Sequence, residues 1–116
     1  MGVENFSQEK IKSIVAAQRE YFASGATLSY EFRRKQLKIL LLALERWNDR
    51  LCDALWSDLH KSPEEALLTE ISIVSGEIKN HLSHLKRWMK RECSATPLKM
   101  MPSRTYVMSE PLGNAL

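Results

Sequence analysis

A chain of 116 residues, 44% hydrophobic and 27% charged, is long enough for one domain with a core and too apolar for a disordered segment. Its longest apolar run, residues 39–44, is far shorter than a membrane span, and its first residues lack the order of a secretion signal. The net charge of +3 comes from cations late in the chain. We assign them to the solvated end of a helix rather than to nucleic-acid binding.

The first two predicted helices have clear ends. Asn5 is the predicted cap of the first, with Gln8 at the reciprocal capping position, and the helix stops at Ser24-Gly25. The second begins at about Ser29 and runs to about residue 47. Apolar residues three and four apart give each of these helices one hydrophobic face.

A third, shorter helix is predicted from Asn48, which can cap it, to residue 59. The second and third helices are either separate or one bent rod. The fourth has the clearest start: Ser62 is the cap, Pro63 the first helical residue and Glu65 the partner in a capping box. It runs over 63–91, about 44 Å, and the shorter helices cannot cover it. Part of its surface should therefore pack on something outside this segment.

Prolines end the helical pattern after residue 92, and residues 105–110 alternate as in a strand. This strand has no predicted partner within the chain, and isolated strands are unstable. The predicted fold class is mainly α, a bundle of three to four helices with a long last helix, followed by an extended tail with one short strand. The predicted division is a helical segment, 1–92, and a tail, 93–116.

Side chains that could carry chemistry are few and scattered. There is no glycine-rich phosphate loop and no nucleophile elbow. His81 and His84, with Glu77 one turn earlier, could hold a metal, but their places on the helix explain them better. Cys52 is interpreted as a small core residue, and Cys93, beside a cationic neighbour, has no histidine near it in sequence. We therefore predict no catalytic, cofactor-binding or metal-binding residue in this chain, and two free thiols typical of a cytoplasmic protein.

The remaining histidine and the tryptophans receive structural interpretations. His60 lies just before a turn, where a cation at a helix end is more typical than a general base. Trp47, Trp56 and Trp88 fall on helix faces, which favours anchors in a core or an interface.

Several segments, in order and with matching gaps, resemble the N-terminal region of aldehyde dehydrogenases of the class 3, fatty-aldehyde type. They are AAQREYF at 16–22, TLSYEFR at 27–33, ALWSDLHKS at 54–62 followed by PEEA, TEISIV at 69–74, HL at 81–82, LKRW at 85–88, PSR at 102–104 and EPLG at 110–113. None is a catalytic motif. One departure is Asn114, where an aliphatic residue is more usual in the family.

The resemblance implies a parent enzyme that oxidises aldehydes to carboxylic acids with NAD or NADP. In that family the helices pack around the cofactor-binding domain, and the strand before Glu-Pro-Leu-Gly belongs to a small sheet through which subunits associate. The catalytic cysteine and glutamate come later than residue 116. The resemblance therefore implies a scaffold fragment, truncated before the cofactor-binding sheet and inactive alone.

Two functions remain open. The first is this enzyme fragment, whose partner is the remainder of the parent enzyme. The second is a free-standing helical module for protein–protein interaction. Without a parent domain, the surplus of apolar surface predicts self-association, through helix 63–91 and strand 105–110, or disorder of the residues after about Cys93. No cofactor is expected for the chain alone.

Overall fold

The computed structural model describes residues 7–113, and serine caps set where its first two helices begin. The Ser7 hydroxyl accepts the Lys10 backbone N–H at the start of α1 (Gln8–Ala23). The predicted cap was wrong in position: Gln8 is the first helical residue, and Asn5 lies outside the described residues. Ser29 caps α2 (Tyr30–Arg46) as predicted.

A left-handed glycine separates these two helices. Gly25 has φ +73°, a conformation that costs other residues a steric penalty, and its N–H donates to the Phe22 carbonyl. The predicted end of the first helix at Ser24-Gly25 is confirmed.

The next helix, α3 (Asn48–Leu59), is separate from α2. Trp47 lies between them with φ −107° and ψ 13°, outside the helical range. The predicted cap was wrong here too, because Asn48 is already helical and its side-chain amide donates to the Asp49 carboxylate. His60, at φ 54°, ends α3 in the left-handed conformation.

The long last helix is confirmed and consists of α4 (Pro63–Ala66), a π-helical turn η1 (Leu67–Ile71) and α5 (Ser72–Trp88). Ser62 caps it by accepting the Glu65 backbone N–H. It spans 26 residues and stops at Trp88, three residues before the predicted end. Inside η1 the Ser72 N–H donates to the carbonyl five residues earlier, Leu67. The Ser72 hydroxyl also donates to a backbone carbonyl, a bond that competes with regular helix geometry.

After the helix the chain forms a hairpin, β1 (Glu92–Ser94) and β2 (Thr105–Val107), with a 3-10 turn η2 (Leu98–Met100) in its loop. The strands are antiparallel, with Cys93 opposite Tyr106. The prediction of a single strand without a partner was therefore wrong, and the strand over 105–110 is shorter than predicted. Three residues in β1 are too few for a period of two to be visible.

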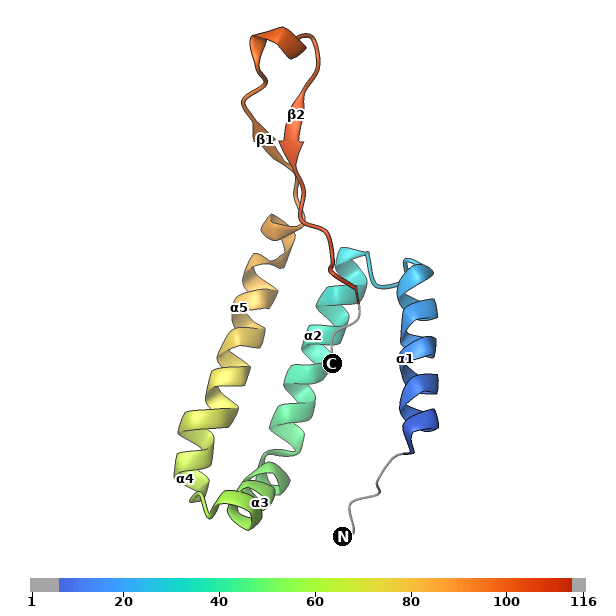
Figure 1. Cartoon of the computed structure of the whole chain (residues 1–116). Coiled ribbons are helices and arrows are strands. Elements are labelled where there is room, and N and C mark those ends of the chain that lie inside the picture. Colours follow the sequence, from blue (N-terminus) through green and yellow to red (C-terminus); the bar gives the residue numbers. More distant parts are fainter. Residues whose placement is uncertain (1–6, 114–116) are drawn as a thin grey trace.

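Figure 1 shows α2 and α5 side by side and antiparallel, with α1 beside α2 and the hairpin projecting beyond the end of α5. Two small groups of side chains form the core. Cys52, Ala66 and Ile71 are buried together where α3 meets the start of the long helix, with Leu51 and Leu55 packed against them. Further along α5, Ile78 and Leu85 are also buried.

The overall dimensions are those of an extended layer, 64 × 38 × 23 Å, with a radius of gyration of 20.1 Å. A compact domain of this length would have a radius of about 13 Å. The accessible surface is 10194 Å², whereas a compact monomer of this mass exposes about 6,500 Å². The chain therefore leaves a large surface that a self-contained domain would bury, as the length of the fourth helix predicted.

This packing predicts very different effects for two isoleucines on α5. Ile78 is 5% exposed and Ile73 is 58% exposed. Ile78→Ala should lower the free energy of unfolding by about 2–4 kcal/mol, because it removes buried methyl groups and leaves a cavity. The matched control, Ile73→Ala, should change it by less than about 0.5 kcal/mol. Urea denaturation followed by circular dichroism measures both, and equal effects would contradict the observed orientation of α5.

Candidate functional site

Two of the histidines predicted to have structural roles lie on α5, where His81 is exposed and His84 is half-buried. The Nδ1 atom of His81 is 2.8 Å from the Glu77 carbonyl oxygen, and that of His84 is 2.9 Å from the Asn80 carbonyl oxygen. Both rings also contact Trp88, one edge-on and one stacked. Among residues 7–113 no three His, Cys, Asp or Glu side chains gather as a metal site would require.

The two cysteines differ in their surroundings. Cys52 is buried in the core cluster, in agreement with its interpretation as a small core residue. Cys93 is exposed on β1. The cation near it in sequence, Arg91, has its guanidinium 4.8 Å from the ring centroid of Tyr106 on the neighbouring strand. This cation–π contact joins the residue just before β1 to β2.

The tryptophans are not core residues. Trp47 and Trp56 are about half exposed and Trp88 is 38% exposed. Arg50 covers the ring of Trp47 at 4.5 Å, and His60 packs on Trp56 with ring centroids 5.4 Å apart. Of the two roles that the sequence left open, the exposed rings favour interface anchors. His60 does lie at a helix end.

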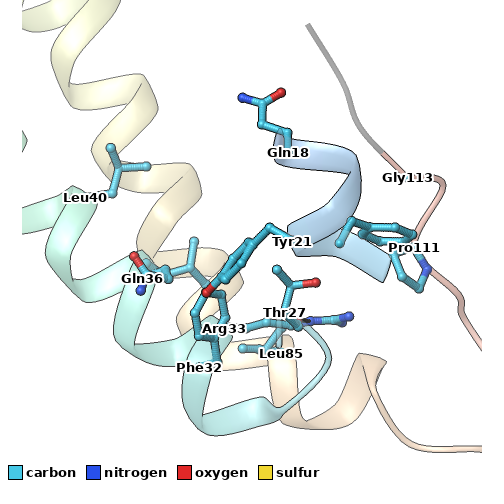
Figure 2. A pocket seen from close by; sticks show the side chains of 12 residues that line it. Gln18, Tyr21, Thr27, Phe32, Arg33, Gln36, Leu40, Leu85, Pro111 and Gly113 are labelled. Atoms are coloured by element: carbon cyan, nitrogen blue, oxygen red, sulfur yellow. Dashed lines mark hydrogen bonds between the residues drawn. The ribbon is translucent and has the colours of Figure 1, made fainter. Parts of the chain in front are cut away.

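A concave feature lies between α1, α2 and α5. This upper cavity has a volume of about 590 Å³, and Figure 2 shows side chains from all three helices and from the tail converging on it. Its lining is mostly apolar, with a few polar side chains: Gln18, Tyr21, Phe22, Thr27, Phe32, Arg33, Gln36, Leu37, Leu40, Leu85, Pro111 and Gly113.

Two contacts near the loop before α2 involve residues that line the upper cavity. The Arg33 side chain donates from Nε to the Thr27 carbonyl at 2.8 Å, and the rings of Tyr21 and Phe32 lie 6.2 Å apart. These contacts join α1 to α2 near their connection. No residue of α1 is buried. A helix held beside its neighbour with no buried side chain leaves its apolar face free for another segment.

A second, smaller concavity of about 300 Å³ lies at the other end of α5. This lower groove is almost entirely apolar and is lined by Leu44, Leu51, Ala54, Leu55, Asp58, Glu70, Ile71 and Val74. Its two carboxylates differ in their pairing. Glu70 forms an ion pair with the Lys61 ammonium, with Oε1 and Nζ 2.5 Å apart. Asp58 has no ion-pair partner within residues 7–113.

A further concavity along the α2–α5 pair has more polar groups in its lining. A cavity of about 600 Å³ there is lined by residues of α2, α3, η1 and α5: Leu44, Glu45, Asn48, Asp49, Leu67, Ile71, Ser72, Ser75, Gly76 and Lys79. Hydroxyl, amide and charged groups of this kind are compatible with solvent. Leu44 and Ile71 line both this cavity and the lower groove, so the two concavities adjoin at these residues and differ in the number of polar groups around them.

Comparison with known proteins finds sequences similar to this chain within longer enzymes. No family model matches the chain. An aldehyde dehydrogenase of Craterostigma plantagineum is 39% identical over 110 residues, 95% of this chain and 23% of that protein. Aldehyde dehydrogenase family 3 member B1 of Bos taurus is 42% identical over 98 residues, 84% of this chain and 21% of that protein.

A solved structure, that of Staphylococcus aureus AldH in a substrate-bound state, agrees in fold. Its TM-score is 0.84 at 32% identity, over 96% of this chain and 23% of that chain. The chain thus spans less than a quarter of the length of these relatives. It belongs to the aldehyde dehydrogenases of family 3, as a segment matching their N-terminal region. Within residues 7–113 no helix has both the length and the apolar character to cross a bilayer.

The difference in exposure between Cys52 and Cys93 can be tested by chemical modification. A thiol reagent such as Ellman's reagent should modify Cys93 at least about tenfold faster than Cys52 in the native chain, because Cys52 is shielded by the core. Cys93→Ser and Cys52→Ser variants assign the two rates, and urea should make them equal. Equal rates without denaturant would show that the core cluster is open in solution.

Proposed function

We propose that this chain is the N-terminal scaffold of an NAD(P)-dependent aldehyde dehydrogenase, inactive alone. The parent enzyme oxidises aldehydes to carboxylic acids in the cytoplasm. Residues 1–92 pack against its cofactor-binding domain, and residues 93–116 contribute the hairpin to subunit association. The observation that carries the proposal is the relationship to family 3 enzymes over nearly the whole chain, together with an apolar surface that the chain leaves uncovered.

The two apolar concavities are where this scaffold would meet the rest of the enzyme. Leu40 and Leu44, one turn apart on α2, line the upper cavity and the lower groove respectively. Both concavities therefore follow the contact line between α2 and α5. We name this strip, from Leu85 and Leu40 to Leu44 and Val74, the apolar seam. Its burial against the enzyme would supply the stability that five buried hydrophobic side chains within residues 7–113 cannot.

The same surface supports a second proposal about partners. Without the remainder of the enzyme, the chain should self-associate through its long helix and through the hairpin strand at 105–107, which is exposed along its length. A free-standing interaction module would use the same surface. The coding sequence after Leu116 separates the two functions: continuation into a catalytic domain favours the scaffold, and an immediate stop codon favours the module.

A chimera tests the scaffold directly. This chain replaces the matching 23% of the Craterostigma plantagineum enzyme, and absorbance at 340 nm follows aldehyde-dependent reduction of NAD and NADP. The chimera should be soluble and active, because the packing faces are expected to match, whereas the chain alone should be inactive.

A matched pair of variants links that activity to the seam. Leu40→Asp in the chimera should abolish soluble enzyme, because it places a charge in the packed face, whereas Leu42→Asp, on the side of α2 that lines a different concavity, should be tolerated. An inactive chimera, or equal effects of the two substitutions, would contradict the proposal.

A further inference from the structure

The side of α2 that is turned away from the apolar seam has a concavity of its own, of about 460 Å³, which only α2 lines within residues 7–113. Its exposed lining residues, which we name the outer strip, are Glu31, Arg34, Lys35, Lys38, Ile39 and Leu42. Lys38 and Leu40 are two positions apart, as are Leu42 and Leu44, so each pair lies about 160° apart around the helix. Leu40 and Leu44 line the apolar seam, and no residue of the outer strip lines either concavity of that seam.

The outer strip has an excess of positive charge. Three cations, Arg34, Lys35 and Lys38, lie within about one helical turn, and Glu31 is the one carboxylate of the strip. A further exposed cation, Arg46, lies one turn beyond the last residue of the strip. None of these four cations has an ion-pair partner within residues 7–113. Their unpaired charges make this side of α2 complementary to an anionic partner.

Two large apolar side chains lie among these cations. Ile39 is 48% exposed and Leu42 is 62% exposed, and their spacing of three residues places them side by side on the helix. Lysine and arginine have long aliphatic stems, so their charged ends can stay in a polar layer while neighbouring apolar groups enter a less polar one. Cations beside exposed aliphatic residues on one helix are typical of helices that lie on a membrane surface.

The shape and size of the outer strip favour a lipid surface over other anionic partners. A single helix provides no second wall to enclose a small ligand. Two apolar side chains are too few for a protein interface of standard size, which buries about 800 Å² on each partner. The headgroup layer of an anionic bilayer needs no enclosing wall, and it attracts every Lys or Arg that lies close to it.

We propose that the outer strip of α2 binds the surface of an anionic membrane. Its Lys and Arg side chains contact lipid phosphates, and Ile39 and Leu42 enter the headgroup region. The apolar seam then lies on the far side of α2, where the rest of the enzyme packs in the proposed function. The outer strip uses no residue of that seam, so membrane binding does not depend on where the chain ends. The two proposals are tested separately, because vesicle binding requires no activity and the activity of the chimera requires no lipid.

Flotation with lipid vesicles tests the binding by the 116-residue chain. Phosphatidylcholine vesicles with about one-third phosphatidylserine should bind the chain at least about tenfold more tightly than vesicles of phosphatidylcholine alone. Raising the salt concentration from about 0.1 M to about 0.5 M should release the chain, because salt screens exposed charges. The chimera should bind the same vesicles in the absence of aldehyde and cofactor, because its outer strip is uncovered.

Charge reversal identifies the surface that binds. Arg34→Glu combined with Lys38→Glu should weaken binding to the anionic vesicles at least about tenfold. The matched control, Lys99→Glu combined with Arg104→Glu, makes the same change of charge in the hairpin loop, where Leu98 is also exposed. It should weaken binding less than about threefold, because the loop lies outside the strip. Circular dichroism checks that both variants keep their helices.

A pair of leucines distinguishes entry into the headgroup region from attraction by charge alone. Leu42→Ala should weaken binding about threefold to tenfold, because it removes apolar groups that the lipid buries. Leu68→Ala, at a position on η1 that is 70% exposed, should leave binding unchanged.

Four results would each overturn the inference. They are equal binding to neutral vesicles, equal losses in the two charge variants, a soluble chimera that does not bind, and binding to soluble poly-glutamate as tight as to the anionic vesicles. The last result would identify an acidic polypeptide as the partner.

Discussion

The packing of α5 against α2 is the interaction on which the rest of this molecule depends. Ile78 and Leu85 are buried there, and the ends of the two helices position every other element: α3 at one end, the hairpin and the tail at the other. Helix α1 is attached to this pair mainly through its loop and the Tyr21–Phe32 contact. Two antiparallel helices form a layer with two sides, and each side must contact either water or another part of a protein.

The concavities differ in chemistry, and that difference carries the functional argument. The upper cavity and the lower groove are mostly apolar, whereas the cavity with Ser72, Ser75 and Lys79 combines hydroxyl and charged groups with apolar side chains. A side rich in exposed apolar groups is costly in water. In the proposed enzyme the remaining chain covers it.

Much of the fold could be predicted from local chemistry, and the failures have local causes. Ser29 and Ser62 were identified because a hydroxyl before an apolar run satisfies free N–H groups at a helix start. Asn5 and Asn48 could also accept such a hydrogen bond. Ser7 caps α1 instead, and Trp47 is the residue before α3, so that Asn48 is already inside the helix. The β1 strand was missed because its partner, β2, is eleven residues away and the pairing is not encoded in either segment alone.

The candidate surface was predictable only in part. Periodicity placed Ile71, Val74, Ile78, His81, Leu85 and Trp88 on one stripe, but it could not say which of them α2 covers. The structure buries Ile71, Ile78 and Leu85 and exposes the other three. That alternation follows from helix geometry, since the buried residues form one row along the helix and the exposed residues form the adjacent row, and the neighbouring helices cover only the first. Which row is uncovered is visible only once the helices have been placed.

The π-helical turn in the long helix has a consequence for how the two buried clusters coexist. Ala66 and Ile71 lie five residues apart, yet both belong to the core cluster with Cys52. In a regular α-helix, positions five apart point about 140° away from each other, so only one of them could face α3. The wider turn brings them to the same side. The π-helical turn acts as a one-residue insertion that shifts the phase of the helix. The first turn can therefore pack against one neighbouring element while the remaining turns pack against another. If one residue were deleted from 67–71, Ala66 and Ile71 could no longer both face α3.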